Sequence, residues 1–278
     1  MNEQIQDAAL LERSPAARVL FGNVPNWAPR ISAGMEKAGH LYHMAPFGQS
    51  DLTQFDALVP LTLGCYRVLD QERGLGRAVP SLWPKADAVA LAGNKVRMSR
   101  HLEAHGFGAH VPKLWETLPE DDSVYPLIAR PAQGSWGRNA FILQSSKDAA
   151  IEKLDETHFL QCYVPGVDEY ATHILLKSGE IRFTRTVHYQ MFDAGCAAEP
   201  YVKGIERRQR SMSWSSESPF LPLMKRILDS FGYADGLCCI DYRIVEGHFW
   251  LFEVNPRFGG SLSMRIEELI PAYLDALN

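Results

Sequence analysis

Three oxygen-bearing side chains near the C-terminal end of the chain, Asp241, Glu253 and Asn255, have a spacing that could hold a metal ion. Two strand-like segments flank a polar turn at residues 246–248. If the loop has three residues, Asp241 lies opposite Glu253, and directly opposed residues share a face. Because side chains alternate along a strand, Asn255 then lies on that face too. The pattern predicts three converging oxygen ligands.

Two carboxylates this close repel each other unless a cation lies between them. Carboxylate and amide oxygens suit Mg²⁺, which often shares its coordination with substrate phosphates. The apolar run at residues 249–252 favours a cleft over an exposed hairpin, although a solvated surface hairpin is the alternative. A two-residue loop at residues 247–248 would place the carboxylates on opposite faces.

The motif Glu-Val-Asn-Pro-Arg-Phe-Gly-Gly-Ser at residues 253–261 resembles the metal-binding segment of ATP-grasp enzymes, together with Asp241 twelve residues upstream. That superfamily includes D-alanine–D-alanine ligase, biotin carboxylase and carbamoyl phosphate synthetase. The resemblance runs in the expected order over roughly residues 90 to 270. It implies ATP as the nucleotide and one or two Mg²⁺ on Asp241, Glu253 and Asn255, with Mn²⁺ possible.

The resemblance also implies a phosphate-binding set. Lys95 stands where a lysine opens the middle lobe of the family, and Arg130 stands where a second lysine is usual. Arginine can bind phosphate in a bidentate manner but does not replace lysine one for one. A glycine-containing loop follows, in which backbone N–H groups can approach an anion closely. Its candidate residues are Gly134, Ser135, Trp136 and Gly137. A surface lysine and a simple hairpin turn are the alternatives.

An interlobe linker resembling that of the family follows at residues 161–170. The resemblance implies that Gln161, Tyr163 and Val164 lie against the adenine and that Glu169 binds the ribose hydroxyls. The family usually has a glutamate in place of Gln161, and the glutamine keeps an acceptor for the adenine amino group. The neighbouring Asp168 is the alternative ribose ligand.

The activity implied by the resemblance is ATP-dependent carbon–nitrogen ligation. A small carboxylate attacks the γ-phosphate to give an acylphosphate and ADP, and an amine then displaces phosphate. Lys95, Arg130 and Arg257 would stabilise the transferring phosphoryl group as catalytic residues. The family often has an arginine two residues before the position of Asp241. Here that position is Cys239, so Arg257 or Arg243 must supply the charge, or it is absent.

Substrate contacts are expected in two places. Gly259, Gly260 and Ser261 could hold a substrate carboxylate through backbone N–H groups and a hydroxyl. Lys203, in a basic stretch, and His188, in the hairpin facing it, are the other candidates, with a solvated loop as the alternative.

Two other functions stay open: phosphoryl transfer to a final acceptor, and non-catalytic nucleotide-dependent regulation. An intact metal trio argues against the second.

Alternating elements must position these residues. Strands at 18–21, 41–44 and 55–61, with a helix at 65–73, predict a small parallel α/β lobe. A helix at 94–105, strands at 125–130, 139–143 and 158–164, and a short helix at 146–154 follow. A hairpin at 169–192 turning at residues 178–179, a loop at 193–216, a helix at 222–231 and a hairpin at 237–254 complete the chain. These elements predict mixed α/β and α+β lobes at 1–90, 91–165 and 166–278, and the family resemblance implies that they form an ATP-grasp fold clasping ATP.

The overall composition fits this interpretation. The 278 residues are 46% hydrophobic and 22% charged, as in globular proteins. A net charge of -5 gives no reason to expect nucleic acid. The five cysteines show neither a disulfide framework nor zinc spacing. A polar N-terminus and the lack of a long apolar run predict a cytoplasmic protein without membrane contact. The resemblance makes a homodimer possible.

Overall fold

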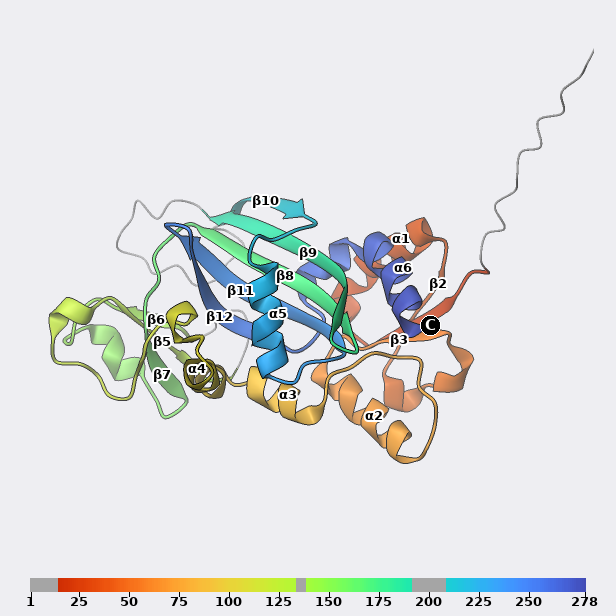
Figure 1. Ribbon diagram of the computed structural model, residues 1–278, viewed down its shortest axis with the longest axis horizontal. Coiled ribbons are helices and arrows are strands. Elements are labelled where there is room, and N and C mark those ends of the chain that lie inside the picture. Colours follow the sequence, from red (N-terminus) through yellow and green to blue (C-terminus); the bar gives the residue numbers. More distant parts are fainter. Residues whose placement is uncertain (1–14, 134–138, 192–208) are drawn as a thin grey trace, which may run out of the picture.

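The computed structural model describes residues 15–133, 139–191 and 209–278, which fold around three β-sheets (Figure 1). The first sheet is parallel, and the other two are antiparallel. This mixture agrees with the predicted fold class. The boundaries proposed near residues 90 and 165 stay predictions. Every helix in the described part of the chain is too short or too polar to span a bilayer.

The first sheet has the strand order β2-β1-β3. Its elements are β1 (Arg18–Phe21), β2 (Leu41–Met44), β3 (Ala57–Val59), α1 (Ala28–Ala38) and α2 (Leu63–Gly74). The last helix, α6 (Ile266–Leu277), lies beside α1 and shares its core (Figure 1). The hydroxyl of Tyr273 on α6 donates to the carbonyl of Leu58 at 2.8 Å and accepts from the N–H of Leu82 at 3.0 Å. The two ends of the chain therefore build one lobe together.

The second sheet has the order β4-β7-β5-β6. Its strands are β4 (Leu114–Trp115), β5 (Leu127–Pro131), β6 (Phe141–Leu143) and β7 (His158–Cys162). Two helices, α3 (Ala86–Ala92) and α4 (Lys95–Ala104), precede it. The side chain of Asn94 caps α4 by accepting from the N–H of Arg97 at 3.0 Å, which fixes where the helix begins.

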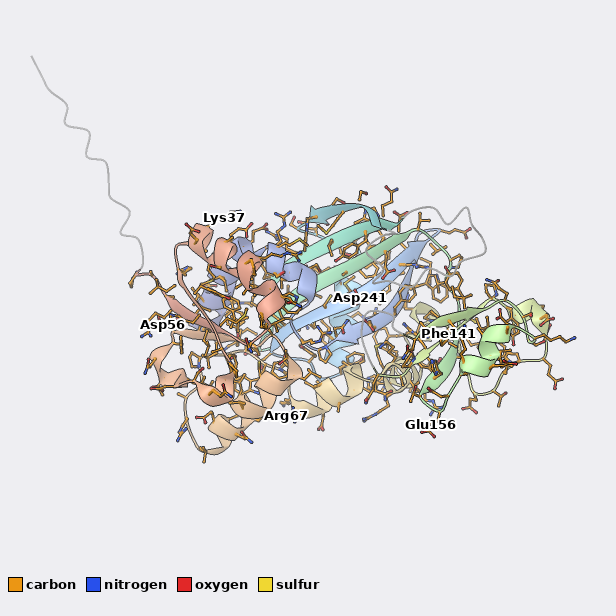
Figure 2. All side chains as sticks on the ribbon, turned by 180° about the vertical axis from the view of Figure 1, so that it is seen from behind. Lys37, Asp56, Arg67, Phe141, Glu156 and Asp241 are labelled. Carbon is orange, nitrogen blue, oxygen red and sulfur yellow. The ribbon has the colours of Figure 1, made fainter. Side chains whose placement is uncertain are left out.

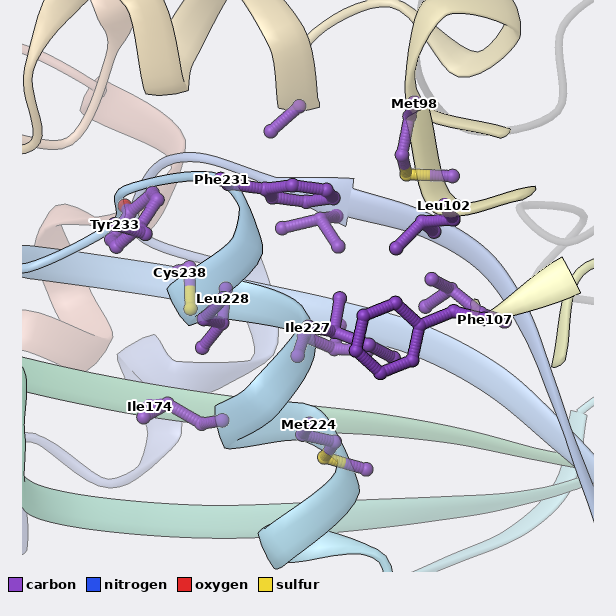
Figure 3. Close-up of a cluster of buried hydrophobic side chains, with 14 of the residues drawn as sticks. Met98, Leu102, Phe107, Ile174, Met224, Ile227, Leu228, Phe231, Tyr233 and Cys238 are labelled. Carbon is purple, nitrogen blue, oxygen red and sulfur yellow. The ribbon is translucent and has the colours of Figure 1, made fainter. Parts of the chain in front are cut away.

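The third sheet has the order β10-β9-β8-β11-β12. Its elements are β8 (Asp168–Lys177), β9 (Glu180–Met191), β10 (Gln209–Ser215), β11 (Gly236–Val245), β12 (His248–Asn255) and the covering helix α5 (Leu221–Ser230). One face packs against α5 and α4 in a buried cluster that includes Met98, Leu102, Met224 and Ile227 (Figure 3). Side chains on the other face, which we call the site face, include Asp241. Asp241 lies near the middle of the molecule, between the other two lobes (Figure 2).

Two local predictions differ from the structure. The short helix predicted at residues 146–154 is a shorter 3-10 helix, η6 (Ala149–Lys153), which Asp148 caps. The predicted loop at 193–216 contains strand β10. The remaining 3-10 helices are η1 (Pro25–Trp27), η2 (Phe47–Gln49), η3 (Leu52–Gln54), η4 (Gly108–His110), η5 (Asp122–Val124) and η8 (Gly260–Met264). The hairpin predicted to turn at residues 178–179 does so between β8 and β9.

The β11–β12 hairpin pairs Asp241 with Glu253 as predicted, but its loop is shorter than predicted. Val245 pairs with His248, so the loop is Glu246-Gly247 and the predicted three-residue loop was wrong. Both loop residues have positive φ, 51° and 77°, as the commonest two-residue hairpin turns require. Continued unbroken, this register would set Asp241 opposite Phe252. A β-bulge instead leaves Phe252 as an extra residue, and Asp241 pairs with Glu253.

Replacement of Gly247 by alanine tests the turn. A Cβ there meets nothing within 4 Å, so the cost arises from the backbone alone at a φ of +77°. We expect Gly247→Ala to lower the free energy of unfolding by about 1–2 kcal/mol in urea denaturation. The control is Gly74→Ala at the end of α2, where there is also free space but no positive φ. This change should be neutral or stabilising by up to ~1 kcal/mol. Equal effects at both positions would contradict the assignment.

Candidate functional site

The three predicted metal ligands converge on the site face. The amide nitrogen of Asn255 donates to Asp241 Oδ2 at 3.0 Å and to Glu253 Oε1 at 2.9 Å. This amide N–H₂ group relieves the repulsion between two adjacent carboxylates. A half-turn of the Asn255 side-chain amide would present its carbonyl oxygen instead, which completes an all-oxygen donor set. Within the described residues no group of three or more His, Cys, Asp or Glu side chains could hold a metal ion, so a metal bound here would need the Asn255 amide as its third donor.

Lys95 forms an ion pair with one member of this trio. It is the first residue of α4, and its Nζ lies 3.0 Å from Glu253 Oε2. Its backbone N–H donates to the carbonyl of Ala132 at 3.0 Å, which ties the start of the helix to the end of β5. Burial raises the pKa of Glu253, but the charge of Lys95, the hydrogen bond from Asn255 and the charge of Arg130 outweigh it and lower the pKa to about 2. Glu253 is therefore a carboxylate at neutral pH.

Arg130 joins the second sheet to the third at the bulge. Its guanidinium donates to the carbonyl of Phe252, the extra residue of the bulge, at 3.0 Å and to Gln161 Oε1 at 2.7 Å. Burial lowers the pKa of Arg130, and attraction to Glu253 and Glu169 opposes this effect. Arg130 thus satisfies a carbonyl that the interrupted strand pairing exposes.

Gln161 has a different environment from the one the sequence predicts. The side chain is 1% exposed, and its amide nitrogen donates to the carbonyl of Pro112 at 2.8 Å. Its oxygen, expected to face an adenine amino group, accepts from Arg130 instead. Both ends of the carboxamide are therefore engaged within the protein, and Gln161 positions Arg130.

Arg257 follows the trio and keeps its charge uncompensated. Its guanidinium donates to the carbonyl of Phe258 at 3.2 Å. Across the described part of the chain, no carboxylate lies within ion-pair distance of it. Arg243, the other candidate for the missing arginine, lies 3.5 Å from Glu169 Oε2 with both side chains buried. At position 239 the structure has the thiol of Cys239, 4.0 Å from Asp241 Oδ1. Arg257 is the better placed of the two arginines to meet an incoming anion.

The alternation of β8 separates the two ribose candidates. Glu169 pairs with Tyr189 and shares the site face, whereas Asp168 points to the opposite face. Arg243 contacts Glu169 and also donates to the carbonyl of Val164, so it fixes the linker to the third sheet. The N–H of Tyr163 donates to the carbonyl of Pro126 at 3.2 Å. The linker is held in place from both lobes.

His188 does not lie with the predicted site residues. It projects from the face opposite Asp241, where its Nε2 lies 2.7 Å from Asp168 Oδ1 and its ring stacks on Tyr170 with centroids 4.6 Å apart. Its predicted substrate contact is therefore not supported by its position. Lys203 and the loop residues Gly134, Ser135, Trp136 and Gly137 lie outside the described residues.

The sequence reasoning missed His173. This side chain lies on the site face, is fully buried, and its Nε2 lies 2.8 Å from Ser261 Oγ. A Cβ at Gly259 would collide with the His173 ring, and one at Gly260 would lie 3.1 Å from Trp27 Cζ2. The two glycines therefore let residues 259–261 pass between the third sheet and the first lobe. Alternation from Glu169 was the available signal, since residues 169, 171 and 173 share a face.

Comparison with known proteins agrees with this architecture. The chain is 27% identical over 160 residues to an L-arginine-specific L-amino acid ligase from Bacillus subtilis. That match covers 52% of this chain but only 37% of the relative, so the chain spans little more than a third of it. No family model matches the chain.

Solved structures resemble nearly the whole chain. D-alanine–D-alanine ligase from Bacillus anthracis has a TM-score of 0.60 at 15% identity, covering 94% of this chain and 97% of that one. N5-carboxyaminoimidazole synthase from Aspergillus clavatus, in complex with ADP and its ribonucleotide, has a TM-score of 0.62 at 13% identity, covering 94% and 77%. Biotin carboxylase from Campylobacter jejuni has 0.59 at 12%, covering 94% and 70%. The predicted ATP-grasp fold is confirmed.

The ion pair of Lys95 and Glu253 predicts a pH-dependent stability. Because the folded-state pKa of Glu253 is lowered from 4.5 to about 2, its contribution is present above about pH 4.5 and lost as the pH falls through about 2. Lys95→Met should lower the free energy of unfolding by roughly 1–3 kcal/mol at pH 7. Urea denaturation at a series of pH values should show the difference from wild type shrinking below about pH 4.5.

The control for this experiment is Lys225→Met. Lys225 pairs with Asp229 on the exposed side of α5 and should contribute at most ~0.5 kcal/mol. A difference for Lys95→Met that stays constant over the acidic range would contradict the assigned pairing.

Proposed function

We propose that this chain is an ATP-dependent, ADP-forming carbon–nitrogen ligase that activates a small carboxylate and couples it to an amine. The observation that carries the proposal is the convergence of Asp241, Glu253 and Asn255 on one face of the third sheet, with Lys95 paired to Glu253 and Arg130 bound to the carbonyl of Phe252 beside them. The similar proteins include ligases and a carboxylase, which supports the proposal. Another structure of the Bacillus anthracis ligase holds ATP, and a biotin carboxylase domain from Hydrogenobacter thermophilus holds MgADP.

The donor set fits Mg²⁺. Asp241, Glu253 and the amide oxygen of Asn255 would hold one or two ions, and Mg²⁺, or Mn²⁺ in its place, would neutralise phosphate charge when bound. In the form described here, the N–H₂ group of Asn255 and the Nζ of Lys95 balance the two carboxylates. Binding would free Lys95 from Glu253, so that the ammonium could turn to the nucleotide phosphates.

The nucleotide would lie between the second and third sheets. Tyr163 and Val164 would line the adenine site from the linker, and Glu169 would accept hydrogen bonds from the ribose hydroxyls. Glu169 is preferred to Asp168 because it shares the face of the metal trio. Gln161 contributes indirectly by orienting Arg130.

The chemistry would follow from the cations around the trio. A substrate carboxylate oxygen attacks the γ-phosphorus, the bond to the β-phosphate oxygen breaks, and ADP leaves. Lys95, Arg130 and Arg257 face the charge that spreads over the transferring phosphoryl oxygens, and fixed cations lower the barrier without reorganising. The amine then attacks the acyl carbon, and phosphate departs with the electron pair of the C–O bond. Gly259, Gly260 and Ser261 would hold a substrate next to Arg257.

A screen of ADP release across small carboxylates and amines, singly and in pairs, tests the proposal. Release that requires both partners supports ligation. Release with one compound alone and a stable phosphorylated product would indicate phosphoryl transfer instead. A homodimer and a cytoplasmic location stay predictions from the sequence.

The metal assignment predicts the effect of Glu253→Gln. This change keeps the shape but removes a negative charge, and ADP formation should fall by at least ~10²-fold. Titration calorimetry should show weaker uptake of MgATP, while circular dichroism stays unchanged. The control is Glu246→Gln, the same chemical change at the exposed tip of the same hairpin, which should leave turnover as in wild type. Equal activity of both variants would remove the basis for the proposal.

The ribose assignment predicts a contrast between two neighbouring residues. Glu169→Gln should weaken ATP binding by about tenfold, since a hydrogen bond to a charged group contributes ~1.5–3 kcal/mol. Asp168→Asn, on the opposite face, should leave the affinity for ATP within about twofold of wild type. The dissociation constants for MgATP measured by calorimetry decide between them. A larger effect at Asp168 would reverse the assignment.

A further inference from the structure

The hydrogen bond between His173 and Ser261 joins two parts of the chain at the edge of the predicted site. His173 belongs to β8 and Ser261 to η8, which follows the metal-binding segment directly. His173 is the cross-strand neighbour of Cys239, and Cys239 is the cross-strand neighbour of Asn255. His173 therefore lies on the strand next to that of Asp241 and two strands away from Asn255.

The surroundings of the pair are charged and aromatic. On the β9 side His173 neighbours Arg185, whose charge is balanced by Glu268 on α6. The ring stacks against Trp214 of β10 with centroids 6.1 Å apart. The guanidinium carbon of Arg265 lies 5.1 Å from the centroid of the Trp214 ring. Arg265 also forms an ion pair with Glu268. Cys239 is the neighbour of His173 on the β11 side.

We propose that Ser261 and His173 form a proton relay that deprotonates the amine substrate. This inference rests on the ligase function proposed above. An amine is an ammonium ion near neutral pH and has no lone pair for attack until it loses a proton. The groups around the trio are fixed cations and ion-binding carboxylates, which are poor proton acceptors there. Histidine is the side chain whose ordinary pKa suits this role near pH 7.

The different burial of His173 and Ser261 gives the two residues different roles. His173 is fully buried, so a substrate cannot touch it, whereas Ser261 is only part-buried. In the tautomer with the lone pair on Nε2, the Ser261 hydroxyl donates to His173 and its oxygen can accept from the substrate ammonium. Ser261 is then the catalytic residue, and His173 is a positioning residue and proton acceptor that acts through it.

The step balances. One ammonium proton passes to Ser261 Oγ while the hydroxyl proton passes to His173 Nε2, which gives an imidazolium and a neutral amine. The nitrogen lone pair forms the C–N bond, and the C–O bond of the acylphosphate breaks towards phosphate. The second nitrogen proton leaves with the phosphate. The imidazolium later returns its proton through Ser261 to water.

Two nucleophiles of different basicity test the relay. Hydroxylamine is largely unprotonated at pH 7 and needs no base, whereas an amino acid ammonium does. We expect His173→Gln to reduce kcat for amide formation by about 10²-fold, with little change in KM for the amine. Hydroxamate formation from hydroxylamine should stay within about threefold of wild type. The loss in kcat should shrink as the pH approaches the pKa of the amine.

Variants at Ser261 keep the test decisive if His173→Gln fails to fold. Ser261→Ala should show the same selective loss, and Ser261→Thr, which keeps the hydroxyl, should retain most of the amide-forming activity. The matched control is His101→Gln, since His101 Nε2 lies 3.3 Å from Ser230 Oγ in a similar pair on α4 and α5. This variant should react with both nucleophiles as wild type does.

The outcomes separate the relay from the ligase proposal. Equal losses with hydroxylamine and amine, or a raised KM for the amine at unchanged kcat, would overturn the relay while leaving ligation intact. These results would indicate that the pair only shapes the segment at residues 259–261 or holds a substrate carboxylate. Wild-type protein that forms neither hydroxamate nor amide with any carboxylate would overturn the ligase proposal itself.

Discussion

The site depends on one irregularity, the β-bulge at Phe252. The two-residue turn at Glu246-Gly247 sets a register in which Asp241 would face Phe252, and Glu253 would be one position out of place. Since the side-chain period of a strand is two, a slip of one residue moves a side chain to the other face. The extra residue restores the pairing of Asp241 with Glu253 and of Cys239 with Asn255. The turn and the bulge each shift the register, and their effects cancel.

The bulge also explains why a cation from another lobe lies there. An unpaired backbone carbonyl away from water is costly, and the carbonyl of Phe252 accepts a hydrogen bond from Arg130. Gln161 holds the same guanidinium from the other side, and Pro112 holds Gln161. A side chain of the second sheet thus supplies the hydrogen bond that the carbonyl of Phe252 lacks within the third sheet. This arrangement places a positive charge beside Glu253 and Glu169, which attract it in turn.

Much of this could be predicted from residue types and spacing. The motif at residues 253–261 with Asp241 upstream was sufficient for the fold and for three predicted ligands whose side chains converge. The predicted loop length was wrong, because the bulge at Phe252 shifts the alternation of β12, and the uniformly apolar residues 249–252 hide that shift in the sequence. Gln161 was assigned to adenine because its packing against Arg130 and Pro112 comes from distant segments. His188 was assigned by proximity along a hairpin, although alternation from Asp168 to Glu169 already distinguished the faces. His173 had no motif around it, and only the approach of residues 259–261 reveals its partner.

The position of α6 has a consequence for how the molecule is made. The first lobe contains strands from residues 18–59, yet its core is completed by Ile266, Leu269, Ile270 and Tyr273 of the last helix. On the ribosome, the parallel sheet emerges long before the helix that covers it, and contacts between such distant segments form late. The apolar surface of these strands therefore stays exposed until residues 266–277 have left the ribosomal exit tunnel. Translation order and folding order are inverted for this lobe, so chaperones would have longer access to residues 18–59 than to the helix that covers them.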